Sequence, residues 1–208
     1  MVDLERACID AVRALSASGV GVSVMADDGV HGMAAASDAH TAMVEDLQFT
    51  YGEGPCIDAF ASGLPVLVSD LTDGAARQWP VYAPAVRAEG ISAVFAFPLQ
   101  IGAARLGVVD VLRTSPGPLS RADLGRALTV ADQMVTLLLD GQERGDGAGV
   151  GHRAELFQAQ GMVSVQLCVA LAEAMVRIRA HAYAENRPLS EVAADIVARR
   201  LRFDIGRP

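Results

Sequence analysis

Short apolar segments, in which small or polar residues alternate with larger ones, recur through the first half of the chain. Val20, Val22 and Val24, for example, are separated by glycine and serine. A period of two residues is typical of β-strands, whose successive side chains point to opposite faces. The predicted strands are 20–25, 31–36, 64–69, 92–99 and 105–112. The turn residues Asp27-Asp28-Gly29 predict a hairpin between the first two strands, and Gly102 predicts one between the last two.

Apolar residues three or four positions apart predict helices between and around these strands. In the segment 3–16, Leu4, Cys8 and Leu15 fall on one face. The other predicted helices in this part are 39–47, 55–62 and 80–89. Strands interspersed with helices over roughly 140 residues indicate an α+β fold, with helices packed against one antiparallel sheet.

A longer helix is predicted at 120–140. Ser120 and Asp123 have the spacing of a capping box, which begins a helix. Its apolar positions follow the spacing of a coiled-coil seam. They are Leu124, Leu128, Ala131, Val135 and Leu138. Because the seam is barely two heptads long, it predicts either a homodimer interface or a terminal helix packed on its own sheet, and a neighbouring second apolar face allows both.

Five glycines within 141–151 predict a flexible linker. The predicted domains are therefore 1–140, which includes the long helix, and 152–208. In the second domain the helical period predicts helices at 153–167, 171–185 and 188–201. Helices of this length are not stable alone in water, so they must pack on each other or on a partner.

Positive charge is concentrated at the C-terminal end of an acidic chain. The 208 residues carry a net charge of −8 and contain no lysine. Residues 151–208 hold eight arginines against six acids, whereas the preceding residues hold nine against nineteen. An acidic protein does not coat nucleic acid non-specifically, but a local cationic patch is compatible with a specific site.

Composition also limits the cellular compartment and the cysteine chemistry that we expect for this chain. No run approaches eighteen consecutive apolar residues, and the acidic N-terminus is no secretory signal, so we expect a cytoplasmic protein that makes no membrane contact. The three cysteines are widely spaced and form neither a disulfide framework nor a CxxC metal site.

Three pieces of the C-terminal segment form an ordered pattern. They are Ala159-Gln160-Gly161-Met162, then Glu173-Ala174 with Arg177-Ile178-Arg179-Ala180, then Arg187-Pro188-Leu189-Ser190-Glu191-Val192-Ala193. Together they resemble the ANTAR domain of bacterial transcription antiterminators. The resemblance implies a three-helix module, active as a dimer, that binds paired hairpin loops in leader RNA and prevents a terminator from forming. The RNA contacts that it suggests are Gln160, Gly161, Arg177, Arg179, His181, Arg187 and Arg199.

The chain departs from that pattern at three positions. Gln160 stands where a lysine is common, which removes one phosphate contact. Cys168 stands where the first turn usually has glycine, at a left-handed backbone position that strains other residues. Ala170 replaces a capping serine and gives up a hydrogen bond worth roughly 0.5–2 kcal/mol. Composition alone would make the arginines a solvated helix face with ion pairs along the helices.

A second set of pieces lies in the N-terminal domain. They are Gly52-Glu53-Gly54-Pro55-Cys56-Ile57-Asp58-Ala59, Pro65-Val66-Leu67-Val68-Ser69-Asp70-Leu71, and Phe95-Ala96-Phe97-Pro98-Leu99 with Leu106-Gly107-Val108. They resemble a GAF domain over residues 1 to about 140. The resemblance implies a sensor fold with a small-molecule pocket on one sheet face, and it identifies neither ligand nor cofactor; no metal or haem is expected. The residues predicted either to line that pocket or to form core are Trp79, Tyr82, Phe95 and Phe97.

Other candidate chemistry is sparse. Cys56 opens a predicted helix, whose N–H groups lower a thiol pKa, so it is either a redox sensor or a buried small side chain. His31 and His40 lack a third ligand for a metal. The sequence does not place together three acids that could act as paired carboxylates, namely Glu53, Asp70 and Asp110. We find no catalytic motif and expect no enzyme.

The sequence therefore predicts a signal-responsive, homodimeric RNA-binding antitermination regulator, with a GAF-like sensor ahead of an ANTAR-like module. The alternative is a GAF sensor whose C-terminal helices dock on a partner protein or on the GAF domain itself. RNA binding weakens steeply with added salt, whereas docking through apolar faces does not.

Overall fold

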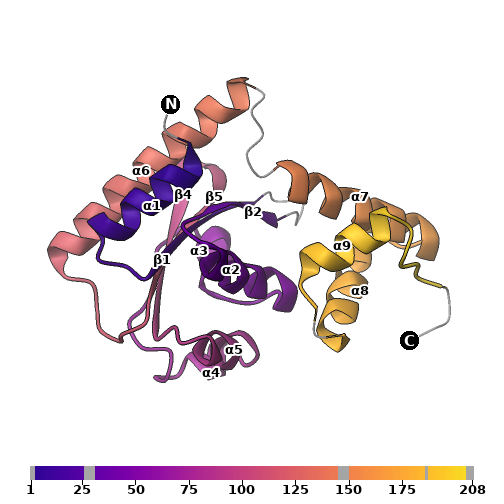
Figure 1. The fold of residues 1–208 in the computed structure, drawn as a ribbon, viewed down its shortest axis with the longest axis horizontal. Coiled ribbons are helices and arrows are strands. Elements are labelled where there is room, and N and C mark those ends of the chain that lie inside the picture. The colour runs from indigo at the N-terminus through magenta and orange to yellow at the C-terminus, as the bar shows by residue number, and fades with distance from the viewer. Residues whose placement is uncertain (1–2, 26–30, 145–149, 186, 205–208) are drawn as a thin grey trace.

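The N-terminal part is built around one antiparallel sheet (Figure 1). The computed structural model describes residues 3–25, 31–144, 150–185 and 187–204. The strands are β1 (Gly19–Met25), β2 (His31–Ala36), β3 (Val66–Val68), β4 (Ala93–Ile101) and β5 (Ala104–Arg113), in the order β2-β1-β5-β4-β3. Both predicted hairpins are confirmed, since β1 pairs with β2 and β4 with β5. The predicted turn at Asp27-Asp28-Gly29 lies outside the described residues.

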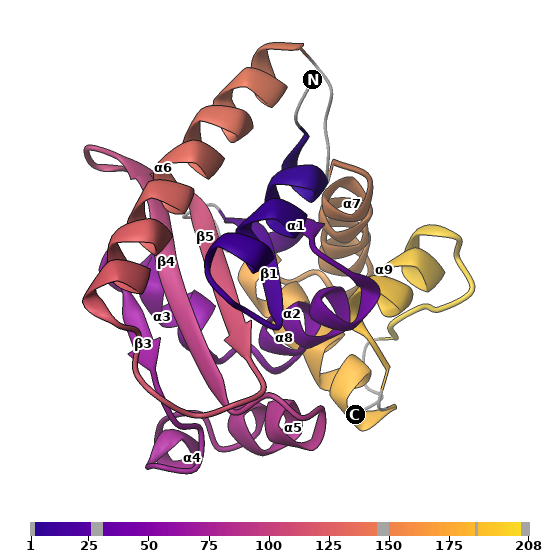
Figure 2. The same ribbon diagram turned by 60° about the vertical axis from the view of Figure 1, so that its left-hand side comes forward.

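Helices cover both faces of the sheet, which confirms the α+β class. The helices on one face are α1 (Leu4–Ala14) and α6 (Arg121–Arg144). Those on the other are α2 (Ala39–Tyr51), α3 (Pro55–Ser62), α4 (Ala75–Gln78) and α5 (Tyr82–Ala88). Figure 2 shows α6 lying along the strands beside α1. Only α4, a single turn of helix, falls on a segment for which we predicted no helix.

The two faces of β1 differ in side-chain size. Its valines point into the core shared with α1 and α6. The alternate positions are Gly19, Gly21 and Ser23, which lie under α2. A Cβ at Gly21 would lie 2.7 Å from Cγ of Glu45 on α2, closer than such atoms approach in real proteins. Small residues on this face therefore let α2 approach the sheet and press polar side chains against it.

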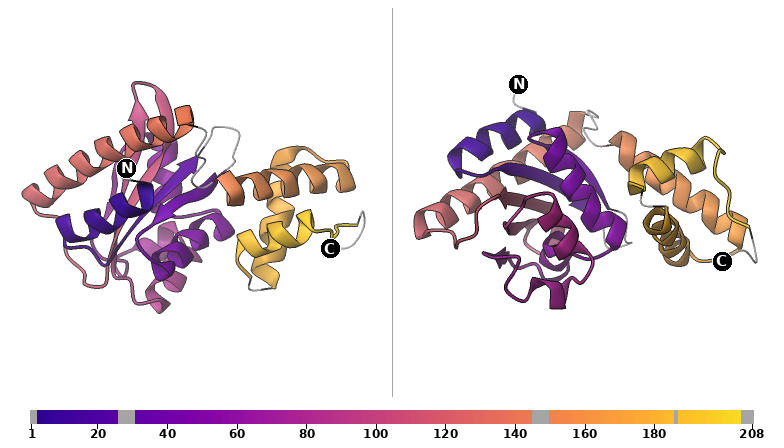
Figure 3. Two further views of the ribbon diagram at one scale, coloured as in Figure 1. Left: turned by 45° about the horizontal axis from the view of Figure 1, so that its top comes forward. Right: turned by 60° about the horizontal axis from the view of Figure 1, so that its bottom comes forward.

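The C-terminal helices form the predicted three-helix module, which lies to one side of the sheet (Figure 3). They are α7 (Val150–Leu167), α8 (Leu171–Ala184) and α9 (Leu189–Val197). Val163, Ile178 and Ile196 are fully buried between them. Among the described residues no single helix is long and apolar enough to cross a membrane; α7 and α8 meet that criterion only as a pair bent by 103°.

The turn between α7 and α8 has the geometry that its unusual residues predict. Cys168 has a φ of 54°, in the left-handed region. Ala170 is the N-cap of α8 and provides no side-chain hydrogen bond. Cys168 and Ala170 therefore occupy the left-handed and N-cap positions at which we placed them.

The long helix α6 exceeds its predicted range of 120–140. It continues to Arg144, and α7 already begins at Val150, so the predicted linker 141–151 is helical at both ends; residues 145–149 lie outside the described part. The capping box is confirmed: the Asp123 N–H donates to Ser120 Oγ at 3.0 Å, and that hydroxyl donates to Asp123 Oδ2 at 2.8 Å.

The apolar seam of α6 packs mainly on its own domain. Ala131 and Leu138 are buried, and Leu124 and Val135 are partly buried against the core shared with α1. Leu128 differs, because 46% of it is exposed. Packing on its own sheet, the second of the two predicted roles, therefore accounts for most of the seam, and Leu128 is left exposed.

Candidate functional site

Two of the side chains predicted to bind RNA form hydrogen bonds within the protein. Gln160 is 2% exposed, and its Nε2 donates to the Leu171 carbonyl at 2.9 Å, which ties α7 to the start of α8. Arg179 Nε donates to the Phe49 carbonyl at 3.0 Å, at the C-terminal end of α2, where the helix dipole favours a cation. Burial lowers the pKa of Arg179. Gln160 is therefore not available to RNA in this conformation, which corrects the prediction for it, whereas Arg179 is partly buried with its Nε engaged within the protein.

Arg187 is engaged in ion pairs within the module. Its Nη2 lies 2.7 Å from Asp195 Oδ2, and its Nε lies 3.6 Å from Glu191 Oε2. Arg200 pairs with the same aspartate at 2.6 Å. Hydrogen bonds from the two arginines lower the pKa of Asp195. Arg187 therefore has the ion pairs that composition alone predicted, and reversing its charge would disturb the fold of α9 as well as any RNA contact.

Arg177 and His181 also have neighbours in the module. Arg177 Nε lies 2.8 Å from Glu173 Oε1, an ion pair between side chains four residues apart, and the arginine is about half exposed. The His181 ring meets Phe203 edge to face, with 5.5 Å between centroids. Exposed pairs of this kind are weak, so Arg177 can exchange its partner for a phosphate at little cost.

Two other predicted residues, Gly161 and Arg199, meet in a shallow groove on the C-terminal module. The groove is also lined by Gln158, Met162, Val165, Gln166 and Arg202. Neither Arg199 nor Arg202 has an ion-pair partner within the described part of the chain. Arg202 was absent from our predicted contacts, although the arginine-rich run after α9 was its signal in the sequence. The groove thus combines two unpaired guanidinium groups with amide side chains.

The C-terminal module docks on the end of α2. The Leu189 N–H donates to Thr50 Oγ1 at 3.3 Å. The rings of Tyr51 and Tyr183 meet edge to face, with 6.0 Å between centroids. Together with the Arg179 hydrogen bond, these contacts attach α8 and α9 to the last turn of α2. The apolar core of the module is continuous with buried residues of α2, α3 and the sheet.

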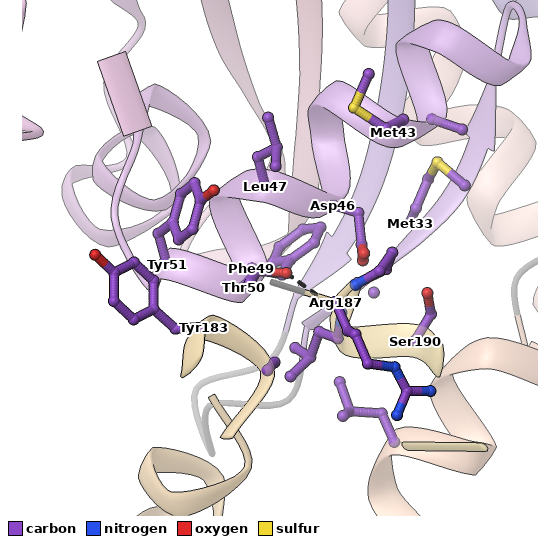
Figure 4. A pocket seen from close by; sticks show the side chains of 16 residues that line it. Met33, Met43, Asp46, Leu47, Phe49, Thr50, Tyr51, Tyr183, Arg187 and Ser190 are labelled. Atoms are coloured by element: carbon purple, nitrogen blue, oxygen red, sulfur yellow. Dashed lines mark hydrogen bonds between the residues drawn. The ribbon is translucent and has the colours of Figure 1, made fainter. Parts of the chain in front are cut away.

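A cavity of about 440 Å³ lies at this junction (Figure 4). The N-terminal domain contributes Met33, Met43 and Leu47 to its wall, and the module contributes Arg187 and Ser190. Figure 4 shows the two docking tyrosines at one end and the two methionines at the other. The volume is in the range of small-molecule sites, and a ligand here would contact both parts of the chain.

The four aromatic residues predicted to line a pocket do not face a common cavity. Phe95 and Phe97 point to the same face of β4, as predicted, and pack with α1 and α6. Trp79 and Tyr82 lie on the opposite face, in the core beneath α2 and α5. All four are at most 3% exposed. They are core residues, so the pocket prediction is wrong and the alternative holds.

Three residues far apart in the sequence meet in a buried cluster under α2. One donor atom each from Glu45, Cys56 and Asp110 lies within 4.8 Å of the other two, and all three residues are 0% exposed. Asp110 sits in β5 opposite Gly21 of β1 and Ala96 of β4, whose small side chains leave room for its carboxylate. Sequence reasoning considered Asp110 and Cys56 separately and missed Glu45, because no local spacing relates them.

Gln48 orients this cluster. Its Oε1 accepts a hydrogen bond from the Cys56 N–H at 2.8 Å, so its Nε2 faces the acids. That group donates to Asp110 Oδ2 at 3.1 Å and to Glu45 Oε2 at 3.4 Å. The other two oxygens, Glu45 Oε1 and Asp110 Oδ1, are buried without a hydrogen-bond partner. Gly54 permits this close approach, since its φ of 144° favours glycine and a Cβ there would collide with Gln48 Oε1.

Burial changes the acidity of all three groups. It raises the pKa of Asp110 to about 6. Burial, together with the charge of Asp110, raises the pKa of Glu45 well above its ordinary value. It also raises the pKa of the Cys56 thiol well above its ordinary value, in spite of the helix N-terminus. Cys56 is therefore not an accessible low-pKa thiolate, and of its two predicted roles the buried small side chain is the one that the structure supports.

The remaining acids and histidines serve local structure. Glu53 Oε1 accepts two backbone N–H bonds at the start of α5, at 2.7 and 2.9 Å. Asp70 accepts from the N–H and hydroxyl of Thr72 at 2.8 and 2.6 Å. His40 is half exposed, 3.9 Å from a glutamate. Neither of these acids belongs to the buried cluster.

A five-stranded antiparallel sheet with helices on both faces places the N-terminal part among the α+β domains of sensor type. A family model described as the GAF domain matches residues 2–138. The chain therefore belongs to the GAF domain family, as the pieces around Gly54 and Phe95 suggested. No curated protein matches the chain.

Solved structures support the same fold. A domain from a sensor histidine kinase protein of Sinorhizobium meliloti is 20% identical, with a TM-score of 0.53, and the match covers 68% of this chain and 92% of that one. The GAF domain of a phosphoenolpyruvate-protein phosphotransferase from Coxiella burnetii is 15% identical, with a TM-score of 0.54, covering 69% and 84%. A type II free methionine-R-sulfoxide reductase from Thermoplasma acidophilum is 17% identical, with a TM-score of 0.50, covering 66% and 90%. Identities this low support the fold alone.

Proposed function

We propose that this protein is a signal-responsive RNA-binding regulator of transcription antitermination, and that it acts as a regulator rather than as an enzyme. The GAF domain senses the signal, and α7–α9, as an ANTAR-like module, bind hairpin loops of leader RNA. The observation that carries the proposal is the groove that joins Gly161 to the unpaired arginines Arg199 and Arg202. Guanidinium groups bind phosphate through paired hydrogen bonds, and amide side chains suit base edges.

The docked arrangement supports a switch in which the module is held partly inactive. Arg179 is retained by the Phe49 carbonyl, so its use as an RNA contact requires α8 to leave the end of α2. A small molecule in the junction cavity would contact both parts and change the balance between docked and released forms. A ligand shifts such a balance only by its difference in affinity for the two states.

The test is a gel-shift titration of the full-length protein with a leader RNA that carries tandem hairpins. The comparison RNA has the same stems with scrambled loops. We expect preferential binding of the first RNA, and a linear fall of log affinity with log salt, with a slope of about −0.7 to −0.9 for each phosphate neutralised. Equally weak binding of both RNAs, or an affinity that does not change with salt concentration, would contradict the proposal.

A second candidate function rests on the contacts of Leu189, Thr50 and Tyr183 between the module and α2. In this alternative the C-terminal helices dock on the GAF domain or on a partner protein and never bind RNA. The same titration separates the two, because apolar docking leaves no salt-dependent RNA complex.

We also propose a homodimer through the exposed part of α6. Leu128→Glu is expected to convert the dimer to monomer in sedimentation at micromolar concentration, since a two-fold axis would set like charges against each other. The domain should lose less than about 1 kcal/mol, because Leu128 is already half exposed. Thr129→Glu, one residue along the helix, is the matched control and should leave the dimer intact. An unchanged dimer in Leu128→Glu would show that the seam serves its own domain only.

A further inference from the structure

The carboxylates of the buried cluster are arranged as ligands. Each uses one oxygen as an acceptor for Gln48 and keeps the other without a partner. These free oxygens, Glu45 Oε1 and Asp110 Oδ1, belong to the group that also includes the sulfur-bearing Cys56. Leaving buried oxygens unpaired costs about 1–3 kcal/mol each, so a bound cation or a shared proton would stabilise this pair.

Tyr82 is a further buried polar group on this face of the sheet. Its hydroxyl has no hydrogen-bond partner among the described residues, although a buried tyrosine normally has one. Burial is the main cause that raises the pKa of this hydroxyl, and the charges of Glu45, Asp110 and Cys56 add to it. The cluster itself offers two unpaired carboxylate oxygens and one sulfur, all from residues that are 0% exposed.

We propose that Glu45, Cys56 and Asp110 bind a divalent metal of the zinc type, through the two unpaired carboxylate oxygens and the Cys56 sulfur. This site goes beyond the proposed RNA-binding function and does not depend on it.

The donor set selects the class of metal. Thiolate is a soft ligand that suits Zn²⁺ and Co²⁺, whereas Ca²⁺ and Mg²⁺ need about six or more oxygens. In a tetrahedral zinc site the ligands lie about 3.3–3.6 Å from one another, as follows from metal–ligand lengths of about 2.0–2.3 Å. The three donors already lie within 4.8 Å of each other, so a small closure around the ion is enough.

Neighbouring side chains hold the proposed metal ligands in place by hydrogen bonds, as is usual around metal sites. Gln48 donates to both carboxylates, and Ser23 Oγ donates to Glu45 Oε2 at 3.4 Å, which holds the ligand oxygens in place. Since the cluster is 0% exposed, the metal has a structural role and enters as the chain folds. Glu45, Cys56 and Asp110 come from α2, α3 and β5, so the ion would join α2 and α3 to the centre of the sheet.

The experiment uses the full-length chain, unfolded with chelator present and refolded with one equivalent of Co²⁺. We expect a thiolate-to-cobalt absorption band in the near ultraviolet, at one Co²⁺ per chain, which Zn²⁺ abolishes. Protein purified from zinc-supplemented cells should contain about one zinc per chain by elemental analysis. Thermal unfolding of the zinc form should occur at a higher temperature than that of the metal-free form.

Variants assign the band to this cluster. Cys56→Ser should abolish it, and Glu45→Gln and Asp110→Asn should each weaken metal affinity more than about 100-fold, beyond the 10–100-fold typical of outer residues. The carboxyl substitutions remove buried charge, so we expect both variants to fold. Cys8→Ser is the matched control, because Cys8 is equally buried on the other face of the sheet.

The outcomes distinguish a metal bound by the cluster from a proton shared between its two carboxyl groups. A refolded wild-type protein with no cobalt band and no zinc after purification would mean that the two carboxyls share only a proton, and the proposal would be wrong. The same conclusion follows if Cys8→Ser loses the band as completely as Cys56→Ser. Both wild-type measurements decide the question even if Cys56→Ser fails to fold.

Discussion

Gly54→Ala is expected to destabilise the GAF domain by about 2–4 kcal/mol, because the substitution combines backbone strain with a collision. Gly54 has a φ of 144°, in a region that is almost confined to glycine. A Cβ here would collide with Gln48 Oε1, which cannot swing away without losing its hydrogen bond from the Cys56 N–H. The variant would therefore disturb the loop and the orientation of the buried acids together.

Two other glycines provide matched controls for this effect. Gly90 has a φ of 82°, but a Cβ there would have no neighbour within 4 Å, so Gly90→Ala tests strain alone and should cost about 1–2 kcal/mol. Gly125 lies inside α6 with open space around it, so Gly125→Ala should stabilise by about 0.5–1 kcal/mol. The urea concentrations at the unfolding midpoints of the three variants measure these differences in stability. If Gly54→Ala costs no more than Gly90→Ala, Gln48 does not pack against this loop as described.

Joint replacement of Arg199 and Arg202 by glutamate is expected to lower affinity for tandem-hairpin RNA by about 100-fold or more. Hydrogen bonds to a charged group contribute about 1.5–3 kcal/mol each, and two such contacts would be lost and replaced by repulsion. The logarithmic salt slope should become shallower by about 1.4, or about 0.7 for each phosphate of a single strand. The fold should change little, because neither arginine has an ion-pair partner among the described residues.

The control must carry the same change of charge, because the protein is already acidic. The side chains of Arg6 and Arg13 on α1 are 59% and 73% exposed and form ion pairs with Asp10, so their joint replacement by glutamate alters net charge far from the groove. This control should reduce RNA affinity only slightly at physiological salt, where screening acts over about 8 Å. Equal losses in both double variants would mean that overall charge, and not the groove, governs binding.

The local sequence pattern was sufficient to predict the helices and strands and to make much of the family assignment. The valines of β1 alternate with glycine and serine, and that period alone predicts a strand with two different faces. The segment from Gly54 to Cys56 predicts a helix start at Pro55, and α3 begins there. The left-handed position of Cys168 followed from the resemblance, in whose pattern a glycine usually stands there. These features depend on backbone sterics and on residues close in sequence, so they can be read without knowledge of the tertiary fold.

What tertiary structure decided was which side chains meet. Glu45, Cys56 and Asp110 come from two helices and a central strand, and only the packing of α2 on the small face of β1 unites them. Arg179 resembles a free cationic residue in the sequence, yet the end of α2 takes up its hydrogen bond. Burial also decided between the two predicted roles of Cys56, because desolvation outweighs the field of a helix N-terminus. The sequence by itself determined the elements and their faces, whereas long-range packing determined which polar groups were buried, paired or left free.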